Sequence, residues 1–173
     1  MLKAVAILVL YAALVLVMGA LAFASAPEGA NKITALIFPG LIAAVSLACV
    51  VMSLFINKKR SVGMIGIHLG IVFPLLVAIA VGHRGYKVHQ DSVQYKEAVE
   101  LWEQRVQEGT VNTPEARERF FEEGNYPEYD KAYLRTALFA ISAISLITFV
   151  AMIAARPKPP ARKPAPEAPA ESA

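Results

Sequence analysis

KKRSVGMIGIHLGIVFPLLVAIAVGHR, residues 58–84, is the stretch of sequence that decides the fold. Three adjacent cations precede residues 61–82, a run of 22 residues without an Asp, Glu, Lys or Arg. About 20 apolar residues are needed for a helix to cross the hydrocarbon core of a bilayer. Cations beside such a run stay on the cytoplasmic side of the membrane. The stretch therefore predicts a membrane-spanning helix with residues 58–60 in the cytoplasm.

Small residues recur along this run at the spacing of a helix. Gly63, Gly66, Gly70 and Pro74 follow one another at steps of 3, 4 and 4 residues, so they share one face. Small side chains at such steps let a neighbouring backbone come close in a membrane. We expect this face to be a helix-packing surface.

His68 is the only histidine in the middle of a span. An ionisable side chain at that depth is a candidate ligand, proton carrier or substrate contact. The alternative is a neutral imidazole that hydrogen-bonds Ser46 or another hydroxyl on a neighbouring helix. A bis-histidine haem would need a second histidine at similar depth, and the chain has none.

Three more apolar runs occupy residues 4–24, 33–56 and 136–155. The chain is 56% hydrophobic, above the 45–50% of soluble domains. We expect an all-α membrane protein, an antiparallel bundle of four transmembrane helices. The first run could instead be a signal peptide, because Ala24-Ser25-Ala26 resembles a cleavage site. Its length of 21 residues exceeds the usual 7–15 and Pro27 would follow the cut, so an uncleaved span is favoured.

Small polar side chains form a stripe on the second run and another on the fourth. The stripes consist of Ser46, Cys49 and Ser53, and of Ser142, Ser145 and Thr148, at steps of 3 or 4 residues. Hydroxyls in such stripes bond across to a neighbouring helix or to their own backbone. The other interpretation is that Ser46, Ser142 and Ser145 contact a ligand on a path through the membrane. A late start or a kink of the second helix is expected at Pro39.

Residues 83–135 are hydrophilic and carry eight Lys/Arg against eleven Asp/Glu, a net charge of −3. We expect a small helical extramembrane cap there. Its first helix would run from about Asp91 to Gln107, with an apolar stripe turned toward lipid or the bundle. Its second would start with Thr113 as N-cap and end near Gly124.

Charge alternates from one loop to the next, and this predicts the orientation. Cations lie at Lys3, at residues 58–60 and in residues 156–173, whereas the other connections are nearly neutral or acidic. We expect the protein in the inner (cytoplasmic) membrane. The positive-inside rule then places both termini in the cytoplasm and the acidic cap on the opposite side of this membrane. Residues 156–173 are rich in Pro and Ala and are expected to be a disordered tail.

No pattern of catalytic or metal-binding residues is present in the sequence, so we expect no enzyme, metal or cofactor. Nucleic acid is not expected either, because orientation already explains the short basic clusters. His83, Arg84 and Lys87 could attract an anionic group at the outer surface. The alternative is that they are end-anchors whose charged tips reach the aqueous phase.

Three stretches resemble the transmembrane protein 14 family, which also includes chloroplast fatty-acid exporters. They are NKITALIFPG (residues 31–40), the end of the third span at Gly82-His83-Arg84-Gly85-Tyr86, and Lys131 before the last span. The resemblance implies a small four-helix protein that moves lipophilic molecules such as fatty acids or porphyrin precursors. Residues 83–135 are longer than the family's connection, and the Pro/Ala-rich tail is additional.

Two classes of function remain open from the sequence. In the first, the protein is a non-catalytic structural or partner-binding component of the membrane, which binds other membrane proteins or a second copy of itself through the cap or the glycine face. In the second, it carries a lipophilic small molecule along a path lined by His68 and the hydroxyl stripes.

Overall fold

The computed structural model describes residues 2–27 and 32–155, and within them every regular element is a helix. The elements are α1 (Leu2–Ala24), α2 (Thr34–Leu54), the 3₁₀ turn η1 (Phe55–Asn57), α3 (Arg60–Gln107), α4 (Pro114–Glu123) and α5 (Ala132–Ala154). Four of them, α1, α2, α3 and α5, are long and apolar enough to cross a membrane. They carry the four apolar runs of the sequence. The expected tail, residues 156–173, lies outside the described residues.

Helix α3 is far longer than the sequence suggested. A span ending at residue 82 and a separate helix from Asp91 were expected, but one helix of 48 residues covers both. At 1.5 Å per residue it is about 72 Å long, more than twice the hydrocarbon thickness of about 30 Å. Residues 83–90 contain one glycine and no proline, and a lone glycine costs a helix only about 1 kcal/mol. Nothing local therefore interrupts the helix where it leaves the apolar run.

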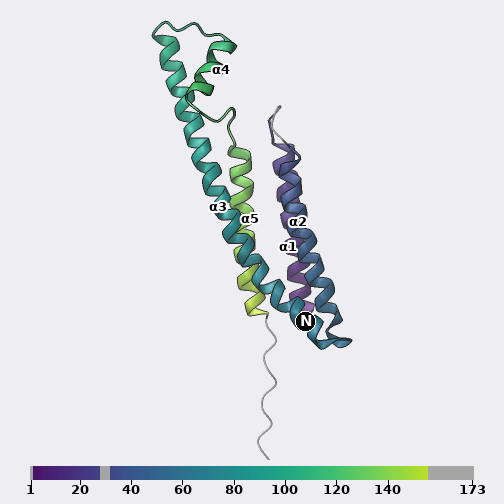
Figure 1. The fold of residues 1–173 in the computed structure, drawn as a ribbon. Coiled ribbons are helices and arrows are strands. Elements are labelled where there is room, and N and C mark those ends of the chain that lie inside the picture. The colour runs from purple at the N-terminus through teal and green to yellow at the C-terminus, as the bar shows by residue number, and fades with distance from the viewer. Residues whose placement is uncertain (1, 28–31, 156–173) are drawn as a thin grey trace, which may run out of the picture.

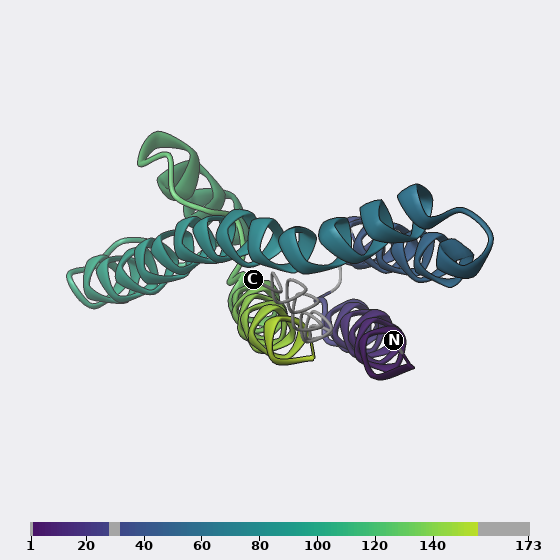
Figure 2. The ribbon, with the colours of Figure 1, turned by 90° about the horizontal axis from the view of Figure 1, so that it is seen from below.

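The spans form two pairs, α1 beside α2 and α3 beside α5 (Figure 1). The start of α1, the η1 turn and the end of α5 lie at the lower end of this view. Seen from below, α1 and α5 are viewed nearly end-on, whereas α3 is visible along most of its length (Figure 2). Helix α3 is therefore steeply tilted relative to α1 and α5, and it passes from the lower end of α2 across to α5.

Glycines permit this crossing. An added Cβ at Gly63 would collide with Ile56 of η1, and one at Gly66 would lie 2.7 Å from the amide nitrogen of Ser53. At Gly70 the nearest atom is a methyl of Leu8 on α1, at 2.8 Å. Together with the buried Pro74, these residues pack inside the molecule, as the sequence predicted.

Pro39 does not delay the second helix, because α2 begins at Thr34 and continues through the proline. The late start considered for this position is therefore wrong. The pyrrolidine ring faces Gly19 of α1, where an added Cβ would lie 2.7 Å from the ring. The absence of a side chain at Gly19 makes room for the ring.

Helix α4 has the ends that the sequence predicted. Thr113 caps it by accepting a hydrogen bond from the amide of Ala116, Pro114 occupies the first position, and Gly124 follows the last turn. The end of α3 is closed by Gly109, which has a φ of +107°. Amide bonds from Gly109 to the Val106 carbonyl and from Thr110 to the Arg105 carbonyl complete a Schellman motif there.

The apolar stripe expected near the end of α3 consists of Tyr95, Val99, Trp102 and Val106, and its two aromatic rings pack on α4. Trp102 lies 5.5 Å from Phe120, and Tyr95 lies 5.8 Å from Phe121, measured between ring centroids. Tyr126 also joins this aromatic cluster. The expectation that the stripe turns toward lipid or the bundle is wrong, because α4 supplies the partner surface.

Candidate functional site

The serines of the two hydroxyl stripes form hydrogen bonds inside the protein. Ser46 donates to the carbonyl of Ile42 at 2.8 Å, and Ser53 donates to the carbonyl of Cys49 at 2.7 Å. Both serines are buried. Bonds of a serine to the carbonyl four residues earlier are the usual way to place a hydroxyl in a membrane helix. The α2 stripe therefore packs in the interior, and its hydroxyls face no open path.

Two hydroxyls of α5 tie this helix to its neighbours. Ser142 donates to the carbonyl of Ala78 on α3 at 2.8 Å. Ser145 donates to the Ile141 carbonyl at 2.7 Å, so its oxygen is free to accept the hydroxyl proton of Tyr11, 2.8 Å away on α1. Sequence reasoning missed Tyr11. A tyrosine in the middle of an apolar run is the signal, since its buried hydroxyl needs a partner.

His68 is exposed on α3, and its ring forms no hydrogen bond to the hydroxyls of either stripe. Its Nδ1 is 2.7 Å from the carbonyl oxygen of Met64 on the same helix. A carbonyl can only accept, so the ring donates from Nδ1, and the Nε2 lone pair remains for another donor. The bond to Ser46 considered from the sequence is not formed, because the Ser46 hydroxyl is buried and donates to the Ile42 carbonyl of its own helix.

The residues around His68 on this face are apolar and exposed. They are Ile65, Val72, Leu76 and Ile79, which are 55%, 47%, 56% and 63% exposed. With His68 they follow the helical steps of 3 and 4 residues, and we call them the α3 outer stripe. The four aliphatic side chains are compatible with contact to lipid, whereas the polar imidazole of His68 is not.

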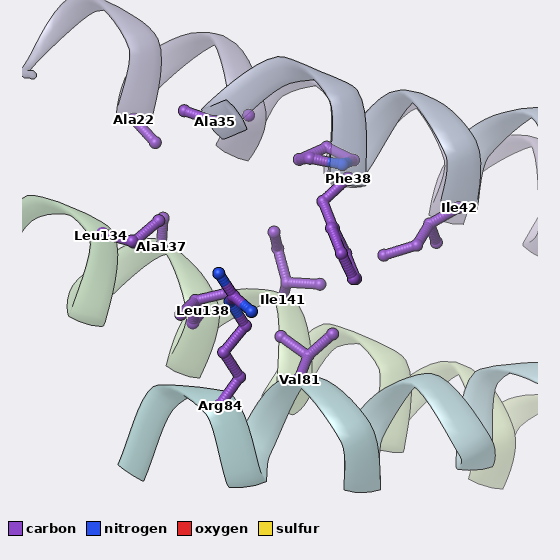
Figure 3. Close-up of a pocket in the computed structure, with 12 residues that line it drawn as sticks. Ala22, Ala35, Phe38, Ile42, Val81, Arg84, Leu134, Ala137, Leu138 and Ile141 are labelled. Carbon is purple, nitrogen blue, oxygen red and sulfur yellow. The ribbon is translucent and has the colours of Figure 1, made fainter. Parts of the chain in front are cut away.

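A cleft separates the two helix pairs near the ends of α1, α2 and α5 that lie away from η1 (Figure 3). Twelve residues line it, and Arg84 is the only charged one. Its guanidinium carbon lies 5.8 Å from the ring centre of Phe38 on α2, a cation–π contact. The volume of the cleft is about 30 Å³, room for about two water molecules.

Of the three cations expected at the outer surface, only Arg84 lines the cleft. Arg84 points from α3 into the cleft toward Ile141 and Phe38 (Figure 3). His83 and Lys87 are exposed and do not line the cleft. Arg84 is exposed as well, but it alone lines the cleft, and the preceding residue His83 points about 100° away around the helix.

Polar contacts between α3 and the start of α5 were not expected from the sequence. Lys131 lies 2.8 Å from Asp91 in an ion pair, and Arg135 donates to Nδ1 of His89 at 3.3 Å. Both Lys131 and Asp91 remain 30–39% exposed, so the pair adds at most about 1 kcal/mol. These contacts orient the chain where it returns toward α5.

Within residues 2–27 and 32–155, no three His, Cys, Asp or Glu side chains gather where they could hold a metal ion. Comparisons of the chain with models of protein families, with curated proteins and with solved structures gave no match.

Proposed function

We propose that the protein is a non-catalytic, multi-pass protein of the inner (cytoplasmic) membrane that binds another membrane protein, or a second copy of itself, through the α3 outer stripe. The single observation that carries the proposal is the exposed imidazole of His68 in the middle of an apolar helix face. Ionisable side chains in a membrane span almost always face protein or a water-filled cavity. A partner that donates a hydrogen bond to Nε2 would satisfy the one polar group on this face.

The topology proposed with this function is an antiparallel four-helix bundle with both termini in the cytoplasm. The placement of residues 58–60 beside the start of α1 and the end of α5 supports it (Figure 1). The net charge of −3 on residues 83–135 supports an external position for the outer half of α3 and for α4. In this arrangement, α4 and the end of α3 form a small helical cap outside the membrane.

The glycine face does not serve as the partner surface in this proposal. Gly63, Gly66 and Gly70 already contact η1, α2 and α1, so no second chain can approach them without displacing these elements. The α3 outer stripe is the alternative surface that the fold leaves open.

Site-specific photo-crosslinking tests the proposal. A photoreactive residue at Ile65, one turn from His68, is expected to give a crosslinked product in native membranes. The same residue at Ile147, 68% exposed on α5, is the matched control and should crosslink to lipid only. His68→Leu should lower the yield at Ile65 severalfold, whereas His68→Gln, which keeps a hydrogen-bonding group, should retain most of it. Equal yields at both positions, or no effect of His68→Leu, would contradict the proposal.

A second candidate function is carriage of a fatty acid or a porphyrin-like molecule, as the resemblance to the transmembrane protein 14 family implies. The apolar cleft with one cation at its mouth favours it. A cleft volume of about 30 Å³ is far too small for such a cargo, so carriage would require the two helix pairs to separate. Movement of labelled fatty acid across proteoliposomes, compared with protein-free vesicles, distinguishes the two functions.

A further inference from the structure

Arg84 is an exposed cation at the edge of an apolar cleft. The other eleven residues that line the cleft are apolar, and they include Phe38, Ile42, Val81 and Ile141. Among the residues that the structure describes, no carboxylate pairs with Arg84, and its one specific contact is the face of Phe38. A cation in such surroundings is complementary to an amphiphile with an anionic head and an apolar tail.

The packing of α3 on α5 holds Arg84 on the cleft side of α3. Gly85 lies against Leu138, and Gly82 lies against Ser142, where an added Cβ would come within 3.3 Å and 2.9 Å of these side chains. The close approach leaves no room for a long side chain between α3 and α5. Arg84, which precedes Gly85, extends into the space between the helix pairs instead.

The position of Arg84 along the spans matches the headgroup region of a bilayer. The cleft lies near the end of α1 and the beginnings of α2 and α5, since its lining includes Ala22, Ala35 and Leu134. On α3, Arg84 follows directly after the uncharged run of residues 61–82, where the proposed span would leave the hydrocarbon core. A guanidinium at this level meets phosphate groups, and it binds phosphate through two parallel hydrogen bonds.

We propose that the mouth of this cleft binds one anionic phospholipid, with its phosphate on Arg84. The cleft measures only about 30 Å³, so the acyl chains stay in the bilayer beside the mouth of the cleft and the contact of the phosphate with Arg84 holds the lipid. This site lies apart from the α3 outer stripe, and it does not depend on the proposed protein partner.

Native mass spectrometry of the full chain tests the site. The protein is released from vesicles that contain phosphatidylcholine, phosphatidylglycerol and oleate. Wild-type protein is expected to retain one phosphatidylglycerol per chain in preference to the other two. Arg84→Gln should lower the retained fraction about 10-fold, since it removes a charge-assisted contact worth about one decade in affinity. Lys87→Gln changes the same charge on the same helix outside the cleft, and it should leave retention unchanged.

A second measurement separates binding from folding. Phosphatidylglycerol should raise the melting temperature of the wild type and of Lys87→Gln, but not that of Arg84→Gln. Arg84→Lys keeps the charge without the two-pronged geometry, and intermediate retention is expected for it. Equal losses for Arg84→Gln and Lys87→Gln would overturn the site. Equal retention of phosphatidylcholine, or retention of oleate in place of phosphatidylglycerol, would overturn the assignment to an anionic phospholipid.

Discussion

At Gly66, α3 approaches α2 so closely that a single methyl group would meet backbone. An added Cβ would lie 2.7 Å from the amide nitrogen of Ser53, which cannot move away without shifting the helix. Gly66→Ala is therefore expected to destabilise the fold by about 1–3 kcal/mol, the usual cost of overpacking. Unfolding of the purified protein in mixed micelles measures the change.

Gly40 provides the matched control for this substitution. It also lies within a helix, but no atom comes within 4 Å of an added Cβ. Gly40→Ala should be neutral or stabilise by up to about 1 kcal/mol, because alanine restricts the unfolded chain more than glycine does. If the two alanine variants were equally stable, the result would contradict the close packing of α3 on α2 at Gly66.

The packing role of individual residues could be predicted where the sequence carries a period. The small-residue spacing of Gly63, Gly66 and Gly70 marked a packing face, and the contacts agree. The neighbours of His68 and Arg84 could not be predicted, because the rotation of α3 about its axis depends on all its partners at once. One such rotation turned His68 outward, and the approach at Gly82 and Gly85 directed Arg84 into the cleft.

The outer half of α3 and helix α4 depend on each other through their aromatic side chains. Phe121 is buried and lies near Tyr95, Phe120 and Tyr126. Arg105 and Arg117 add cation–π contacts at 4.9 Å and 5.3 Å to Phe120 and Phe121. A 10-residue helix is marginal in water by itself, so the cluster must hold α4 in place.

Phe121→Ala should release α4 without unfolding the spans. Loss of a buried phenyl group costs about 3–5 kcal/mol. We expect this cost to exceed the free energy that holds the short helix α4 against α3. We expect trypsin to cleave at Arg117 and Arg119 much faster in the variant, while the melting of the membrane-embedded part stays the same. Val111→Ala, at a position 70% exposed in the α3–α4 connection, should behave like the wild type.

Helix boundaries were predictable where a terminating signal exists. Thr113-Pro114 and Gly109 act through local hydrogen bonds, and α4 and the end of α3 follow them. Between residues 82 and 91 the sequence changes from apolar to polar but contains no terminator. Passage from lipid to water does not by itself end a helix. The structure therefore has a continuous helix where a break between two helices was predicted.

The whole molecule has an orientation that a labelling experiment can establish. Cys49 is the single cysteine and is fully buried, so Cys49→Ser gives a background without thiols. Single cysteines are then placed at Lys59 and at Gln104, both exposed. In right-side-out membrane vesicles, an impermeant maleimide is expected to label position 104 and to reach position 59 only after permeabilisation. The reverse pattern would invert the topology proposed here.

Four apolar helices could be predicted from hydropathy alone, because a bilayer forces every backbone polar group into an internal hydrogen bond. The tilt of α3 and the cleft between the helix pairs could not be predicted from hydropathy. They depend on where Gly63, Gly66 and Gly70 meet η1, α2 and α1, and these pairings exist only in the assembled molecule.

Because α3 is one continuous helix, its outer half is rigidly connected to the membrane span. Residues 83–107 continue the helix for about 37 Å past the apolar run, with α4 attached near the far end. A thinner bilayer makes a long span lean further, and the rigid arm would swing α4 through a much larger arc. Small differences in membrane thickness would thereby become large displacements in the aqueous space.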